Sequence, residues 1–192
     1  MNLFSQVQIL IAVGTQLNGL WVEESFKPPF DLNCYFNAIF ELIVSENRIY
    51  SAEAVQLWIN IMTNQYIQRN PTIALATQQL SKIVTNSKLL FKINTDNLMD
   101  EFNSEDDFKK FAQKYRTDLT RLIRLATNLY LVDFLGASFE WANSILFETS
   151  KLPANDQTGY DLNSFLFLCW DALIYLWTSI MPVSYVWKKN FY

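Results

Sequence analysis

The amino-acid sequence predicts an all-α fold. The chain has 192 residues, which is the length of one domain or of a short array of repeats. It contains only 4 Gly and 5 Pro, whereas β-sandwiches, barrels and Gly-rich phosphate loops use these residues in their turns. Hydrophobic residues make up 51% and charged residues 18%, which excludes a disordered tail. Apolar residues recur with a helical period along most of the chain, so long helices joined by few turns are expected.

Seven helices are predicted from this period, and each is bounded by residues that start or stop helices. Ser51 and Ser104 are the expected N-caps of the third and fifth helices, because a hydroxyl accepts a hydrogen bond from a free backbone N–H. Asn70 is expected to cap the fourth helix, with Pro71 in its first position, and Pro182 ends the seventh. The predicted spans are 2–21, 31–44, 51–67, 71 to about 83, 104–129, 132–149 and 161 or 163 to 181.

Short connections make consecutive helices antiparallel neighbours, so the predicted helices sort into pairs. The repeat segment is predicted over 1–181, with a leading helix at 2–21 and pairs at 31–67, 71–129 and 132–181, while 182–192 form a separate tail. The first two pairs begin about 40 residues apart, which is the length of a HEAT or armadillo unit. Aromatic residues beyond a single stripe widen the apolar faces, as stacked solenoid helices require. A compact bundle requires the same, so both packings remain open.

No residue pattern indicates catalysis or a metal site. The chain has no His, which removes the commonest general base and the commonest neutral metal ligand. Cys34 and Cys169 match no zinc or redox spacing and are expected to be reduced thiols in the core, and the acidic clusters at 100–107 are interpreted as solvated helix starts. The apolar run at 165–181 is too short for a membrane span and contains Asp171. We therefore predict no catalytic residue, cofactor, metal, small-molecule substrate or membrane insertion.

The predicted fifth helix carries the candidate binding residues. In projection, its apolar side chains from Phe108 to Leu129 share one face. Lys110, Lys114, Arg121 and Arg124 fall within an arc of about 80° on the opposite face. Four cations in a line can track a phosphate backbone, but charged residues on the solvated back of a helix produce the same pattern. The spacing alone leaves both interpretations open.

Several segments resemble, in order and in spacing, a central stretch of the exportin-5 family of karyopherins. They are Val13–Leu17, Ser51–Trp58, Ile67–Pro71, Phe102–Phe108, Arg121–Ala126, Phe139–Trp141 and Phe165–Met181. The resemblance implies an α-solenoid of HEAT-like helix pairs, with the third, fifth and seventh helices on its concave side. It ends at Met181, which implies that the chain is a middle piece of a longer receptor.

The resemblance also implies a function. The family binds the small GTPase Ran in its GTP form together with structured RNA, such as pre-microRNA and tRNA, or protein cargo. It passes the nuclear pore by contacting pore proteins and shuttles between nucleus and cytoplasm. The cations of the fifth helix would then contact double-stranded RNA through its backbone and shape.

Two other classes of function stay open on the sequence. One is a generic helical scaffold that binds peptides or helices in an apolar groove and has no nucleic-acid role. The other is a helical enzyme, which would require a closed pocket with a buried carboxylate pair.

Overall fold

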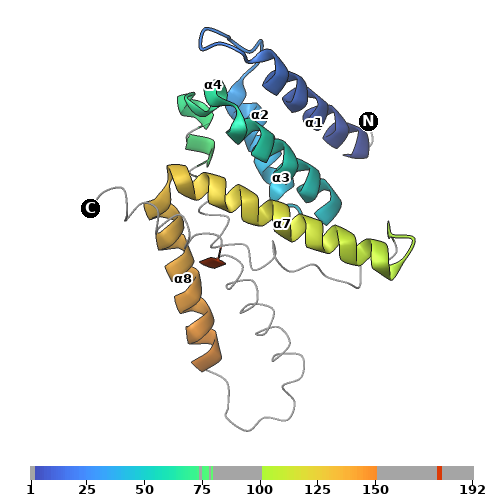
Figure 1. The fold of residues 1–192 in the computed structure, drawn as a ribbon, viewed down its shortest axis with the longest axis vertical. Coiled ribbons are helices and arrows are strands. Elements are labelled where there is room, and N and C mark those ends of the chain that lie inside the picture. The colour runs from blue at the N-terminus through green and yellow to red at the C-terminus, as the bar shows by residue number, and fades with distance from the viewer. Residues whose placement is uncertain (1–2, 74, 78, 80–100, 151–176, 179–192) are drawn as a thin grey trace.

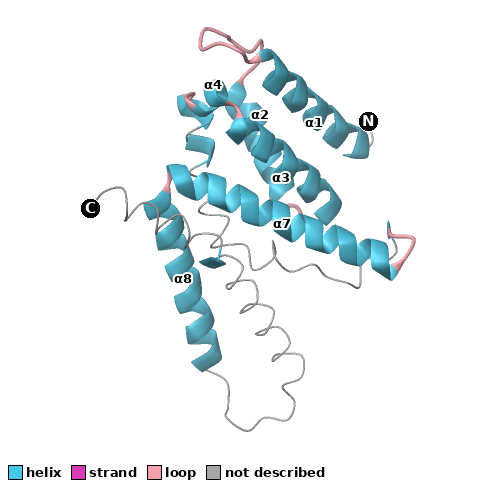
Figure 2. Ribbon diagram, in the orientation of Figure 1, coloured by secondary structure: helices cyan, strands magenta, loops and turns pink. Residues whose placement is uncertain are grey.

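The computed structural model describes residues 3–73, 75–77, 79, 101–150 and 177–178, and every regular element within these ranges is a helix (Figure 1, Figure 2). The helices are α1 Leu3–Leu20, α2 Leu32–Ile43, α3 Arg48–Thr63, α4 Gln65–Gln68, α7 Glu105–Leu129 and α8 Leu131–Ser150. A further helical stretch follows α4 at 71–73 and 75–77. The predicted all-α class is therefore confirmed.

The helix α3 is the centre of the described fold. It contacts α1, α2, α4 and α7, and α8 in turn contacts α7. Figure 1 shows α3 between α1 and α7. Nine of the 16 residues of α3 are buried, among them Trp58, Ile59 and Ile61, which point to different sides of the helix. A helix with neighbours on several sides needs apolar residues around most of its circumference, and α3 has them.

Short polar side chains begin most of the described helices. Asp31, Asn47, Asn64, Asn70 and Ser104 each accept a hydrogen bond from a backbone N–H two or three residues further on. Each bond satisfies a donor that has no partner within its own helix. The predicted caps Asn70 and Ser104 are confirmed.

The predicted third helix, 51–67, is wrong at both ends. It begins at Arg48, with Asn47 as its N-cap, because an Asn side chain one turn earlier competes successfully for the free N–H groups. Ser51 is instead a buried residue within α3, where its Oγ donates to the carbonyl oxygen of Ile43 at 2.6 Å. The helix also ends earlier than predicted, at Thr63, and α4 follows as a separate short helix.

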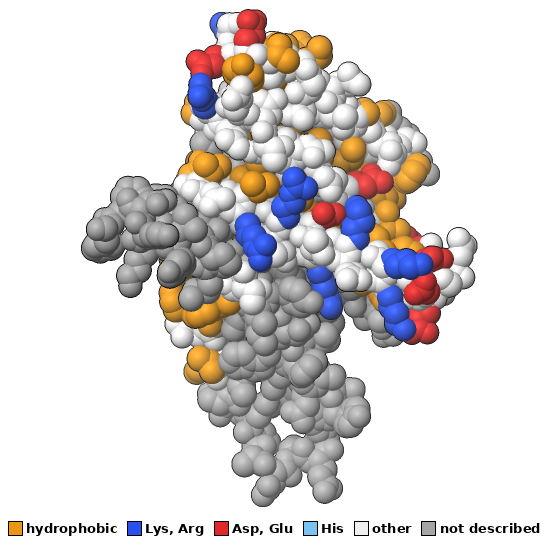
Figure 3. Space-filling model, in the orientation of Figure 1, with side chains coloured by type: hydrophobic (Ala, Val, Ile, Leu, Met, Phe, Trp, Pro, Cys, Tyr) orange, Lys and Arg blue, Asp and Glu red, His pale blue; other side chains and the backbone are white. Residues whose placement is uncertain are grey.

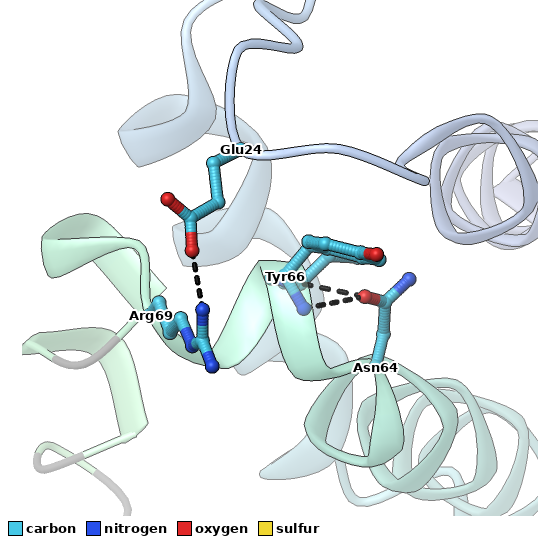
Figure 4. A network of polar contacts seen from close by, with 5 residues as sticks. Glu24, Asn64, Tyr66 and Arg69 are labelled. Atoms are coloured by element: carbon cyan, nitrogen blue, oxygen red, sulfur yellow. Dashed lines mark hydrogen bonds and ion pairs between the residues drawn. The ribbon is translucent and has the colours of Figure 1, made fainter.

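Asn64 causes this break and ties three helices together. Its backbone is extended, its Oδ1 accepts from N–H groups in the first turn of α4, and its Nδ2 donates to the carbonyl oxygens of Asn18 and Trp21 at 3.0 and 3.1 Å. The end of α1 is thereby fixed to the junction of α3 and α4. Just beyond α4, Arg69 forms an ion pair with Glu24, which holds the connection between α1 and α2 at the same place (Figure 4).

At Gly14, α1 closely approaches its neighbours α2 and α3. A Cβ at this position would lie 2.1 Å from the Tyr35 hydroxyl oxygen and 2.7 Å from a methyl carbon of Leu57. The Tyr35 hydroxyl passes over Gly14 to donate to the carbonyl oxygen of Leu10 at 2.8 Å. Only a residue without a side chain leaves room for this contact, which joins α1 to both α2 and α3.

The expectation of two core thiols is wrong for Cys34. The residue is exposed on α2, and its thiol donates to Oδ2 of Asp31 at 3.4 Å, a carboxylate contact that raises the pKa of the thiol. The larger apolar side chains of Tyr35, Phe36 and Ile39 cover the buried face of α2, which leaves position 34 on the outside. Cys169 lies outside the described residues.

For the sixth helix, the helical period of the sequence predicts an apolar stripe of Leu135, Phe139, Ala142 and Leu146, and this stripe is wrong in part. Of its members, Phe139 and Leu146 are 53% and 52% exposed, whereas Phe134, Ala137 and Ser138 are buried among the α8 side chains that the structure describes. The sequence offers two apolar faces on this helix, and packing against α7 uses the one around Phe134, which joins the hydrophobic core.

Much of the predicted pairing falls outside the described residues. This applies to the fourth helix beyond 79, to the segment 86–100, to the seventh helix except residues 177 and 178, and to the tail at 182–192. The described helices contact one another as α1 with α2, α1 with α3, α2 with α3, α3 with α4, α3 with α7 and α7 with α8.

Candidate nucleic-acid interface on α7

The start of α7 is set by a reciprocal cap. The N–H of Asp107 donates to Oγ of Ser104 at 3.1 Å, and the Ser104 hydroxyl donates to Oδ2 of Asp107 at 2.8 Å. Glu105, Asp106 and Asp107 all lie in the first turn, where the positive end of the helix dipole stabilises carboxylates. The acidic cluster at 105–107 is thus an exposed helix start, as predicted, while Glu101 precedes the helix and Asp100 lies outside the described residues.

One face of α7 is anchored against α3. Phe108, Leu119 and Leu122 are buried on this face, and the Tyr115 hydroxyl lies 2.8 Å from Oγ of Ser51 in the interior. Burial raises the pKa of Tyr115, because the phenolate would lose its hydration. The predicted apolar face is confirmed up to Ala126, which is fully buried.

At the end of the helix the pattern fails. Leu129 is 46% exposed, since α7 gives way to α8 one residue later, after the C-cap Tyr130.

The four predicted cations are all exposed, but their surroundings differ. Nζ of Lys110 lies 2.6 Å from Oδ2 of Asp106, and Nζ of Lys114 lies 3.4 Å from Oδ2 of Asp118. Arg124 donates to the backbone carbonyl oxygen of Thr178 at 3.3 Å. Arg121 has no polar partner within the described ranges of the chain. The structure thus presents two cations engaged by neighbouring carboxylates, one bonded to a carbonyl and one open to solvent.

These cations form a row along the exposed side of α7. We call Lys110, Lys114, Arg121 and Arg124 the basic row. Figure 3 shows Lys and Arg side chains following one another over α7, on the side of the molecule that faces the viewer. The helix carries six Lys and Arg against four Asp and Glu, although the whole chain has a net charge of −4. The α7 surface is therefore locally basic on an acidic protein.

Lys109 is a cation near this row that the projection did not include. Its Nζ lies 2.7 Å from Oε1 of Glu105. The hydrogen bond and the charge of the partner lower the pKa of Glu105 and raise that of Lys109. The spacing of four residues between Glu105 and Lys109 is the sequence signal for this pair, and it also applies to Lys110 and Asp106.

The carboxylate pairs do not block the row. Each pair is exposed on at least its lysine side, and exposed ion pairs contribute only about 0.2–1 kcal/mol. A phosphate oxygen can replace such a carboxylate at small cost, particularly where several phosphates bind together. The arrangement is suited to reversible binding of a polyanion. In the described part of the chain, no group of three or more His, Cys, Asp or Glu side chains is placed to hold a metal ion.

A search of protein-family models and a search of curated proteins found no match to this chain. Within the described ranges, no helix has both the length and the apolar character that a membrane crossing requires.

Proposed function

We propose that this chain supplies part of the cargo-binding surface of a nuclear export receptor of the exportin-5 family. It would act without catalysis, as packed helices that present the basic row to structured RNA such as pre-microRNA or tRNA, or to acidic protein cargo. Ran-GTP and nuclear pore proteins would be further partners of the receptor, which would shuttle between nucleus and cytoplasm. The repeats would stack as an α-solenoid.

The observation that carries this proposal is the basic row itself. Its four cations lie along one exposed side of a 25-residue helix whose opposite face is held in the core. A rigid helix fixes the spacing of its cations before binding. Little backbone entropy is therefore lost when RNA binds. A-form RNA is bound largely through phosphates and sugar hydroxyls, which such a row can contact without reading bases.

Charge reversal of the row tests the RNA-binding part of the proposal. We expect the variant Lys110→Glu/Lys114→Glu/Arg121→Glu/Arg124→Glu to lose binding of a short RNA duplex. The negative slope of log affinity against log salt should also become shallower by about 1 for each cation that contacts a phosphate. Fluorescence anisotropy with labelled duplex between about 50 and 200 mM salt measures both quantities.

A matched pair of variants separates a local effect from net charge. Arg121→Glu/Arg124→Glu removes two members of the row, and Gln6→Glu/Gln16→Glu/Lys27→Glu changes the net charge equally at exposed positions outside α7. Binding should weaken strongly only in the first variant. Equal affinity and equal salt slopes in wild type and in the fourfold variant would refute the RNA-binding role.

A further inference from the structure

A groove crosses α3 between α1 and α7, beside the basic row. Its volume is about 390 Å³, which lies in the range of about 300–1,000 Å³ typical of ligand pockets. Ile11 of α1, Ile49 and Ala52 of α3 and Phe111 of α7 supply apolar lining. All four side chains are only partly buried. The groove therefore offers apolar surface that the core does not use.

The two sides of the groove carry opposite charges. On the side of α1, Glu53 is held by Gln8, whose Nε2 donates to both carboxylate oxygens at 3.0 and 3.3 Å. On the side of α7, Lys114 extends into solvent with its side chain 74% exposed and is only loosely paired with Asp118. An occupant that complements this groove needs an apolar centre with acidic groups on the flank next to α7.

This chemistry fits a protein helix better than RNA. An amphipathic helix places apolar side chains at positions i, i+3, i+4 and i+7 into such a groove and carries charges on its flanks. An RNA duplex presents phosphates and hydroxyls, which would leave the apolar lining uncovered. A protein helix also satisfies its own backbone hydrogen bonds, so that its backbone makes no demand on the apolar half of a lining that also contains Thr15, Gln56 and Asn60.

We propose that the groove between α1, α3 and α7 binds an amphipathic helix of a partner protein, with its acidic flank against Lys114. This inference deepens the proposed function and rests on it, because Lys114 belongs to both the groove and the basic row. It assigns the protein cargo to the groove and leaves Arg121 and Arg124 to contacts outside it.

The experiment uses the full 192-residue chain and two designed helical peptides. Both have the same leucine stripe and one flank of Lys, which suits Glu53, and their other flank is Glu in one peptide and Lys in the other. We expect the Glu peptide to bind wild type more tightly than the Lys peptide. The variant Lys114→Glu should weaken the Glu peptide about fivefold or more and strengthen the Lys peptide.

Filling the groove gives the decisive comparison. Ala52→Arg places a long charged side chain on the apolar lining and should weaken the Glu peptide at least tenfold. Ala12→Arg, on the exposed side of α1 and outside the groove, is the matched control and should leave affinity unchanged. Gln56→Arg, also in the lining, repeats the test at a position that packing constrains less if Ala52→Arg does not fold by circular dichroism.

The two proposals fail in different ways. RNA binding should depend on Arg121 and Arg124 and should tolerate Ala52→Arg, whereas peptide binding should show the reverse. Equal affinity of wild type and Ala52→Arg for the Glu peptide, or no preference for Glu over Lys flanks, would overturn the groove proposal and leave the RNA proposal intact. If the chain binds no RNA but binds the Glu peptide as expected, the RNA proposal fails and the groove remains the partner site of a helical scaffold.

Discussion

The contact of Tyr35 with α1 shows how much can depend on one missing side chain. Gly14 lies within an α-helix, where glycine normally costs about 0.5–1 kcal/mol relative to alanine. The cost is offset because α1 can approach α2 and α3 closely enough for the Tyr35 hydroxyl to reach the Leu10 carbonyl oxygen. Composition had indicated only that glycine is rare, and nothing in the sequence distinguishes Gly14 from Gly19.

We expect Gly14→Ala to lower the free energy of unfolding by about 1–3 kcal/mol, because the new methyl group would overlap Tyr35 and Leu57. Gly19→Ala is the matched control on the same helix. No atom lies within 4 Å of a Cβ built there, so its helix propensity should stabilise the protein by about 0.5–1 kcal/mol. Urea denaturation followed by far-UV circular dichroism measures both changes. A Gly14→Ala protein as stable as wild type would contradict the close approach.

Ser51 illustrates a different limit of sequence reasoning. A serine ahead of an apolar run is a typical N-cap, and the local pattern therefore predicted a helix start. Its actual role depends on Tyr115, which is 64 residues away in the sequence and 2.8 Å away in the fold. Arg48 adds a positive charge beside the same phenol and opposes the rise of its pKa. Such a buried polar cluster arises from packing, and no local pattern reveals it.

At the scale of elements, α7 was the most predictable part of the chain. Its cap, its acidic first turn, its buried face and its row of cations all follow from periodicity within one helix. The carboxylates that pair with Lys110 and Lys114 are also visible as residues four positions away. The groove, in contrast, needs three helices to meet, so the candidate site was predictable on α7 alone.

The reciprocal cap predicts the effect of changing Ser104. Ser104→Ala should lower the free energy of unfolding by about 1 kcal/mol, since it leaves the Asp107 N–H without its acceptor. Ser104→Asp should retain most of the stability, because aspartate is also a good N-cap and carries a charge that the helix start favours. Denaturation curves of the two variants provide the measurement. Equal losses for alanine and aspartate would show that the side-chain acceptor contributes nothing.

At the scale of the whole molecule, the fold class followed from turn-poor composition and helical period, while the arrangement around α3 did not. Periodicity gives each helix a buried side, but it does not choose between two candidate sides, as α8 shows with Phe134 and Phe139. It also cannot identify a helix such as α3 as the common neighbour of four others. That information lies in contacts between distant residues.

Two buried tyrosines that join helices predict alkaline instability. Burial raises the pKa of both Tyr35 and Tyr115, whereas in the unfolded chain each titrates near 10.0. Their contribution to stability is therefore fully present below about pH 10 and is lost as the pH rises beyond it, by at most about 1.4 kcal/mol per pH unit for each tyrosine.

Urea midpoints measured from about pH 8 to 11, alongside tyrosinate absorbance, test this expectation. Tyr35→Phe and Tyr115→Phe should each be less stable at neutral pH and should show a shallower loss above pH 10. A stability that stays constant through this pH range would contradict the burial of the phenols.

The central position of α3 also affects the order in which contacts form while the chain is being synthesised. Its contacts with α1, α2 and α4 involve residues up to 68 only, so they can form as soon as that part of the chain leaves the ribosome. The side of α3 that includes Ser51 can be covered only after Tyr115 has been synthesised. At a synthesis rate of about 5–20 residues per second, that wait lasts roughly two to ten seconds. During this interval we expect the nascent chain to expose its future core, and chaperone crosslinking to arrested chains should be strongest just before α7 emerges.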